Sequence, residues 1–262
     1  MIIDIHTHCF PDPLAARAVS SLSHTSGLKP FQDGTIDGLM KSMSESGVDL
    51  SVLQPIATKP DQTVSINKWA AEVNNDKIIS FGTIHPEFEN FKDTIKWLTE
   101  HGFKGIKFHP EYQNFFVDDP AYFKLYEAIF NAGLIIIFHS GVDLSYSEPF
   151  RCTPKRLHTL LDTFPGSKII AAHMGGYRYW NDTEKYLIGR DIYLDTAFSL
   201  PELGQEKASR IIKEHGASKI LFASDSPWAD PGKDISIIKS LPINDTEKNN
   251  ILGENAKKLL SL

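Results

Sequence analysis

Eight apolar runs of strand-like length recur along the chain, and each gives way to polar residues at its end. They cover residues 2–6, 48–54, 78–84, 103–109, 134–139, 168–173, 191–196 and 219–224. Segments with helical periodicity lie between most of them, at 35–46, 91–100, 119–131, 153–163 and 205–215. Strands that alternate with helices in units of about 30 residues predict parallel strands joined by right-handed crossovers.

Eight such units close a (β/α)8 barrel, so we expect an α/β protein with one TIM-barrel domain over residues 1–262. An open, doubly wound sheet is the alternative. The barrel is favoured because polar residues end the strands from the first to the eighth, and only a closed ring brings these ends together. Residues 9–34 predict a loop insertion beside the mouth of the barrel. Residues 244–261 predict two short helices, broken at Gly253, that pack against the outside of the barrel.

Composition narrows the class of protein without identifying a function. With 41% apolar and 23% charged residues, the chain is typical of an ordinary globular protein. A net charge of −6 and the lack of a Lys/Arg cluster argue against a nucleic-acid partner. No apolar stretch approaches the roughly 20 residues that span a membrane, and the amino terminus lacks a signal-peptide pattern, which predicts a cytoplasmic protein. The two cysteines predict free thiols. The oligomeric state stays open, with a homodimer as the commonest assembly.

The polar residues at the strand ends carry the candidate chemistry. Six of the ten histidines and one aspartate hold such positions: His6, His8, His85, His109, His139, His173 and Asp225. In a barrel these side chains converge at one mouth. His6 and His8 are two residues apart, so on an extended strand both point to the same side and can share one metal ion.

A metal ion explains why polar groups end such apolar runs. A polar group at the end of a buried strand needs a partner, and a metal supplies one. Four ligands, His6, His8, His139 and Asp225, predict a site for one divalent ion, Zn²⁺ or else Mn²⁺, with a position left for water or substrate. Polar residues that are satisfied by hydrogen bonds alone are the alternative.

These residues resemble the metal-dependent amidohydrolase superfamily, specifically the amidohydrolase-related branch that includes aminocarboxymuconate semialdehyde decarboxylase. The resemblance rests on DIHTH at 4–8, GIKFHP at 105–110, His139, AHMGG at 172–176, SDSPW at 224–228 and GENAKKLL at 253–260. It implies metal ligation by His6, His8, His139 and Asp225. It further implies two catalytic residues: Asp225, which accepts a proton from water, and His173, an acid, base or polarising group beside the metal.

The chain departs from the binuclear members of the superfamily in the fourth strand, where those carry a carboxylated lysine or a glutamate that bridges two metals. Here the run is Lys107-Phe108-His109. His109 is expected to occupy the level of the mouth in place of Lys107, which favours one metal and makes His109 a substrate-binding or supporting group. Further candidate substrate-binding residues are Tyr177, Arg178, Arg151 and Trp228, the two arginines as partners for a carboxylate.

Three functions are compatible with these residues. The first is a metal-dependent hydrolase, in which metal-activated water attacks a C–N or C–O bond of a small substrate. This substrate can carry a carboxylate. The second is a non-oxidative, metal-dependent decarboxylase of an unsaturated or aromatic acid. The third, from a different class, is a catalytically silent barrel that binds a ligand. The sequence does not separate hydrolysis from decarboxylation.

Overall fold

The computed structural model describes residues 1–262 and confirms the α/β barrel. Its strands are β1 (Ile3–Thr7), β2 (Leu50–Leu53), β3 (Ile78–Ser80), β4 (Gly82–Thr83), β5 (Gly105–Phe108), β6 (Ile135–Phe138), β7 (Ile169–Ala171), β8 (Tyr193–Asp195) and β9 (Ile220–Leu221). β3 and β4 are separated by Phe81 alone and together form the third of the eight predicted strands. Each predicted run contains a strand, so the hydrophobic pattern locates all eight.

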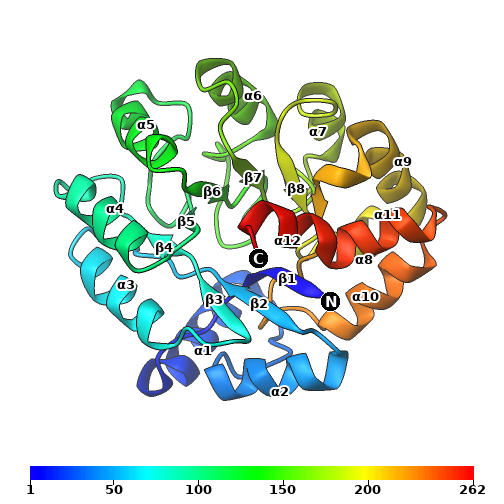
Figure 1. The fold of residues 1–262 in the computed structure, drawn as a ribbon, viewed down its shortest axis with the longest axis horizontal. Helices are drawn as coiled ribbons and strands as arrows, with labels where there is room; N and C mark the ends of the chain where they lie inside the picture. Colours follow the sequence, from blue (N-terminus) through cyan, green and yellow to red (C-terminus); the bar gives the residue numbers. More distant parts are fainter.

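All strand pairs are parallel, and the ring closes between its first and last strands. One sheet has the order β1-β2-β3 and the other β4-β5-β6-β7-β8-β9. The Phe81 N–H donates to Leu53 O across the break between the sheets, and the Ile5 N–H donates to Phe222 O (N···O 3.0 Å) between β1 and β9. A parallel bridge between Thr7 and Ser226 extends this contact. The carboxyl ends of the strands therefore meet at one mouth, as Figure 1 indicates from the opposite end of the barrel.

Helices surround the strands in the order expected for the fold (Figure 1). They are α1 (Asp12–Ser26), α2 (Ile36–Ser46), α3 (Gln62–Glu72), α4 (Phe91–Glu100), α5 (Phe123–Asn131), α6 (Pro154–Thr163), α7 (Trp180–Tyr186), α8 (Leu200–Leu203), α9 (Gln205–His215), α10 (Pro231–Ser240), α11 (Asp245–Asn249) and α12 (Asn255–Leu260), with short turns η1 (Pro120–Tyr122), η2 (Ala217–Lys219) and η3 (Asn250–Glu254). Local chemistry sets several starts: the Thr153 side chain accepts the Arg156 N–H while Pro154 occupies the first turn of α6. No helix has both the length and the apolar character needed to cross a membrane.

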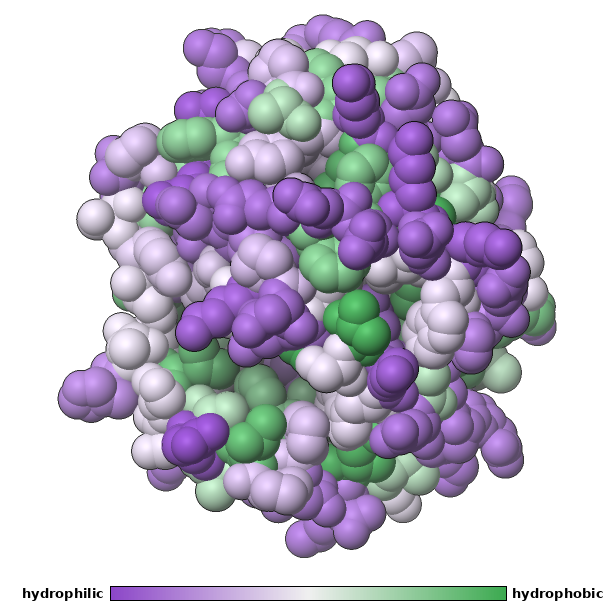
Figure 2. Space-filling model, turned by 90° about the vertical axis from the view of Figure 1, so that its left-hand side faces the viewer, coloured by the Kyte–Doolittle hydropathy of each residue, from purple (hydrophilic) through white to green (hydrophobic).

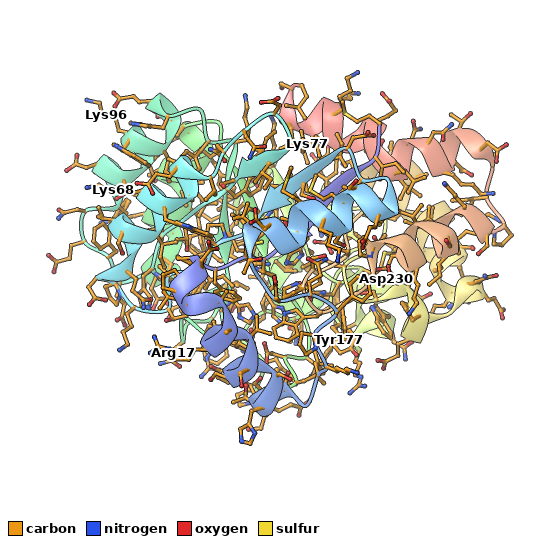
Figure 3. The ribbon with its side chains drawn as sticks, turned by 90° about the horizontal axis from the view of Figure 1, so that it is seen from below. Arg17, Lys68, Lys77, Lys96, Tyr177 and Asp230 are labelled. Carbon is orange, nitrogen blue, oxygen red and sulfur yellow. The ribbon has the colours of Figure 1, made fainter.

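The insertion at 9–34 is not simply the loop that the sequence predicts, because it contains the 15-residue helix α1. The helix follows Pro11 and ends at Gly27, whose φ of 72° suits glycine. Only Ala15 and Val19 of this helix are buried, so its apolar stripe is too narrow for a periodicity signal. Figure 3 shows α1 at the same end of the molecule as Tyr177 and away from Lys77, which precedes β3. The helix therefore stands at the mouth of the barrel.

The carboxyl-terminal segment also differs from the prediction. α11, η3 and α12 follow one another without a break at Gly253, and they cross the amino-terminal end of the barrel rather than its outer wall (Figure 1). A Cβ at Gly253 would lie 2.1 Å from Met1 O, so the glycine permits a close approach to the first strand instead of ending a helix. Ala256, Leu259 and Leu260 join the apolar cluster inside the barrel and close its floor.

The apolar core has two parts on either side of the strands. A cluster of 14 buried residues fills the barrel and its floor, and a cluster of 46 lies mainly between the strands and the helices. The side of the molecule that carries α3 and α4 is largely hydrophilic, with hydrophobic residues gathered in its centre and lower half (Figure 2). The smaller cluster fills the barrel below the mouth, and the larger one reaches the mouth through Cys9 and Tyr177.

Candidate metal centre

The mouth of the barrel holds a cavity of about 260 Å³. Eight of the residues that the sequence singled out line it: His6, His8, His109, His139, His173, Tyr177, Asp225 and Trp228. His85, Arg151 and Arg178 do not line it. Arg178 forms an ion pair with Glu202 and lies over the ring of Tyr177, and Arg151 donates to the Asn114 side chain. Six of the seven strand-end residues thus line the cavity, as do Tyr177 and Trp228 from the loops, whereas the two arginines do not.

Two histidines from the first strand and an aspartate from the last converge most tightly. The Nε2 atoms of His6 and His8 lie 3.2 Å apart, and Asp225 Oδ1 lies 3.5 Å from the first and 3.3 Å from the second. The two Asp225 contacts join the end of β1 to the loop after β9, which closure of the ring makes neighbours. Two imidazole nitrogens and a carboxylate oxygen are donors that suit Zn²⁺ and Mn²⁺, so these residues fit the expected ion.

The other nitrogen of each imidazole is held from behind. His6 Nδ1 lies 2.9 Å from Asp195 Oδ2, and His8 Nδ1 lies 2.8 Å from the backbone oxygen of Gln54. An acceptor at Nδ1 fixes the proton there and turns the lone pair of Nε2 toward the site, as a metal ligand requires. Burial lowers the pKa of His6 well below its usual value, so this ring is neutral, as a ligand must be.

Asp225 is held as a carboxylate in a strained position. Burial works against its charge, but the nearby rings of His8, His6 and His173 hold the pKa of Asp225 well below its usual range. Its φ of 68°, like the φ of 60° at His173, lies in the left-handed region that few side chains adopt. Such strain persists where the surrounding structure requires it, and it clusters at functional sites.

His139 and His173 form a second pair beside the first group. His173 Nε2 lies 3.0 Å from His139 Nδ1, while His173 Nδ1 is held 2.9 Å from Ala197 O. The rings of His6 and His173 are 5.5 Å apart. His139 Nε2 is buried and has no hydrogen-bond partner. An orphaned imidazole nitrogen in the wall of the cavity is available for a ligand.

Lys107 reaches the site, contrary to the expectation that His109 would take its place. The lysine is fully buried, and its Nζ lies 2.8 Å from His6 Nε2. Its register partner on β6 is Ile137, a residue of the inner cluster, so the side chain points into the barrel and is long enough to climb to the mouth. Burial lowers the pKa of Lys107 to about 8. His109 lies farther along the chain, in the loop, and faces Asp143.

Sequence reasoning missed three residues of the site: Lys107 as a contact of His6, and the carboxylates Asp195 and Asp143. Asp195 ends β8, and it accepts the His173 N–H (2.8 Å) through Oδ1 in addition to contacting His6 through Oδ2. Its strand-end position was the signal that could have found it. Asp143 follows β6 by five residues, and only the fold of that loop brings it to the cavity.

His109, His139 and Asp143 make up a second group, whose nitrogen and oxygen atoms lie within 4.8 Å of one another. The rings of His109 and His139 are stacked, with centroids 4.1 Å apart and planes inclined by 12°. A nitrogen lone pair lies in the plane of its ring, so two nearly parallel rings cannot both direct one at the same ion. This group is therefore better suited to hydrogen bonding than to holding a metal.

Comparisons with known proteins identify the family of the chain. No curated protein sequence matches the chain. Solved structures with the same fold include 5-carboxyvanillate decarboxylase from Sphingomonas paucimobilis (17% identity, TM-score 0.74, 100% of this chain and 99% of that one) and an uncharacterized TIM-barrel protein from Bordetella bronchiseptica (18%, 0.78, 99% and 98%). A third is dihydroxybenzoic acid decarboxylase from Polaromonas sp. JS666 with bound manganese (16%, 0.73, 100% and 97%). The family model described as Amidohydrolase matches residues 3–262. The chain therefore belongs to the amidohydrolase family of metal-dependent enzymes.

Proposed function

We propose that this protein is a metal-dependent hydrolase that acts on a C–N or C–O bond of a small substrate. The observation that carries the proposal is the convergence of His6, His8 and Asp225, with three donor atoms 3.2–3.5 Å apart. These donors are held from behind and line a cavity large enough for a small molecule. A site of this kind, with protein donors on one side and free space on the other, is typical of catalytic rather than structural metal centres.

The proposed ligands of one divalent ion are His6, His8, His139 and Asp225. We propose Zn²⁺, since nitrogen-rich sites with one carboxylate are typical of it. Mn²⁺ is the alternative, and the bound manganese of the Polaromonas decarboxylase supports it. When bound, such an ion supplies Lewis acidity, which polarises a carbonyl and lowers the pKa of water from 15.7 to about 7.

The side chains supply the proton transfers. Asp225, held as a carboxylate, accepts the proton of the attacking water at a carboxylate oxygen. His173 donates through Nδ1 to Ala197 O, so its Nε2 would take up the water proton from Asp225 and pass it to the leaving group. Asp195 contacts both His6 and the His173 backbone and so keeps the two rings in a fixed relation. His109, Tyr177 and Trp228 are the proposed substrate contacts, and Arg151 and Arg178 drop out because neither lines the cavity.

Decarboxylation of an unsaturated or aromatic acid is the second candidate. The specific observation in its favour is the apolar wall of the cavity, which suits a ring, next to the Lys107 ammonium, which suits a carboxylate. The decarboxylases among the similar folds agree with this candidate. Both reactions use the same side chains, so products must separate them.

Metal content and product analysis test the proposal together. Protein purified without chelators is expected to hold one equivalent of zinc or manganese by plasma mass spectrometry. Asp225→Asn should lose it, whereas Asp76→Asn, a matched change on an exposed loop, should not. The loaded enzyme is then offered lactones, amides and esters, and separately hydroxybenzoates with detection of carbon dioxide. Turnover of the first panel supports hydrolysis; carbon dioxide release with no turnover of the first panel establishes the decarboxylase instead.

A further inference from the structure

Asp143 is a buried carboxylate in the wall of the cavity. It is 8% exposed and lies in the segment between β6 and α6. Its Oδ1 accepts the Ser145 N–H at 2.8 Å, and its Oδ2 lies 3.4 Å from His109 Nε2. The side chains of Tyr112 and Ser145 are further hydrogen-bonding neighbours. The 3.4 Å contact with His109 is too long for a strong hydrogen bond, so Asp143 Oδ2 can accept a further donor from the cavity. Burial raises the pKa of Asp143, against the opposing effect of its hydrogen bonds.

The neighbours of Asp143 hold it in place. The His109 N–H donates to Gln113 Oε1, and the amide of Gln113 donates to Ala57 O and Ile84 O, which ties three loops of the mouth together. The ring of His109 is stacked between Tyr112 (3.7 Å) and His139 (4.1 Å). A rigid support of this kind is what a recognition group needs, because less entropy is lost when the ligand binds.

The remainder of the cavity has few ways to recognise charge. Apart from histidines, Lys107 is the single basic side chain of the lining, and it lies against His6 at the candidate metal centre. Phe10, Leu22, Leu28, Ile66, Leu144 and Phe198 provide much of the apolar surface, and Leu22 and Leu28 come from α1 and the residues after it. A second anionic group on the substrate would meet apolar wall or Asp143 itself, and burying such a charge without a partner is strongly unfavourable.

We propose that Asp143 determines specificity by accepting a hydrogen bond from a hydroxyl or amino group of the substrate. The rest of this substrate is apolar, and its only anionic or carbonyl group lies at the metal centre. This inference rests on the proposed function, because it takes the reacting group to lie beside His6 and Asp225. It excludes substrates with two carboxylates and favours a single ring with one hydrogen-bond donor.

Calorimetric binding of simple probes tests the inference without requiring turnover. The probes are benzoate, the three hydroxybenzoates and the three corresponding methoxybenzoates, titrated into metal-loaded protein. At least one hydroxybenzoate is expected to bind about 10- to 100-fold tighter than its methoxy counterpart, the usual gain from a hydrogen bond to a charged acceptor. Asp143→Ala should remove that preference while leaving the affinity for benzoate within about twofold. Glu148→Ala removes an exposed carboxylate from the same segment and should keep the preference.

The outcomes separate this inference from the proposed function. Equal affinity of wild-type protein for hydroxy and methoxy probes overturns the role of Asp143. An equal loss of affinity for all probes in Asp143→Ala also overturns it. If that variant does not fold, Asp143→Asn decides: a reduced preference with unchanged benzoate binding supports the inference, and an unchanged preference overturns it. A preserved donor preference in a protein that turns over nothing would leave the recognition role standing and defeat the proposed hydrolase.

Discussion

The two ends of the barrel are built on opposite principles. At the floor, Ala256, Leu259 and Leu260 of α12 pack on residues inside the strands, and the closure is apolar. At the mouth, histidines and carboxylates face a cavity, His139 Nε2 has no partner, and three non-glycine residues of the cavity wall, His173, Phe198 and Asp225, adopt positive φ. The chain thus places satisfied, close-packed groups at one end and unsatisfied groups at the other.

This difference indicates how the barrel divides stability from chemistry. Apolar closure stabilises the fold by removing surface from water, with no demand on exact donor placement. Unpartnered and strained polar groups cost stability, and they persist where a ligand or metal supplies what is missing. Substitutions at the mouth should therefore reduce activity with little loss of stability, and substitutions at the floor should do the reverse.

The largest effect is expected from removing a metal-binding imidazole. His8→Ala should lower turnover at least about 10³-fold, equivalent to about 4 kcal/mol of transition-state stabilisation. The thermal midpoint of the metal-free protein should barely change, because His8 is only partly buried. Steady-state kinetics and a thermal melt in chelator make the measurement. A variant with full turnover would contradict the assignment of His8 to the metal.

His173→Asn should produce the next largest loss. Removal of a positioned acid or base lowers turnover by about 10²–10⁴. Metal content should stay at the wild-type value, since His173 Nε2 contacts His139 rather than the first group. His101→Asn, which changes an exposed histidine on the outside of the barrel, is the control. If metal content falls together with activity, His173 is a ligand and not a proton carrier.

The floor provides the reciprocal test. Leu260→Ala should lower the free energy of unfolding by about 2–5 kcal/mol, the usual cost of truncating a buried leucine. Turnover per folded molecule should remain within about twofold. Urea denaturation followed by kinetics measures both, with Leu262→Ala, which is 47% exposed, as the matched control. A large fall in turnover would show that the two ends are coupled and would break the comparison.

The sequence predicts the eight strands, the barrel and the strand-end residues of the cavity because each depends on a repeating local pattern. His6, His8, His173 and Asp225 are found in this way, since each follows an apolar run. Helix α1 gives no such signal because it buries only two residues, and a helix that mostly faces solvent and cavity lacks the stripe that reveals one.

The predictions that were wrong concern residues whose contacts depend on the three-dimensional fold. The sequence does not reveal that the side chain of Lys107, which starts lower in the barrel, is long enough to reach His6. Nor does adjacency to a motif indicate direction: Arg178 follows the AHMGG motif closely, yet it turns to Glu202 at the surface. Gly253 resembles a helix end because glycine often is one, whereas here it makes room for Met1 O.

The smallest effect sharpens the comparison at the level of a supporting residue. Asp195 is fully buried, contacts His6 through Oδ2 and receives the His173 and Ala197 N–H groups through Oδ1. Asp195→Asn keeps the shape of the side chain but replaces one carboxylate oxygen with an NH₂ group. Either the N–H of His6 Nδ1 or the backbone N–H groups of His173 and Ala197 then lose their acceptor. Loss of such a partner lowers metal affinity by about 10–100-fold.

Competition with a chelator of known affinity measures the change, and Asp191→Asn, in the exposed segment before the same strand, is the control. Unchanged metal affinity with a lower unfolding free energy would place Asp195 among the groups that only stabilise the fold. A weakened metal site in a stable protein would show that the functional end of the barrel extends one layer below the cavity.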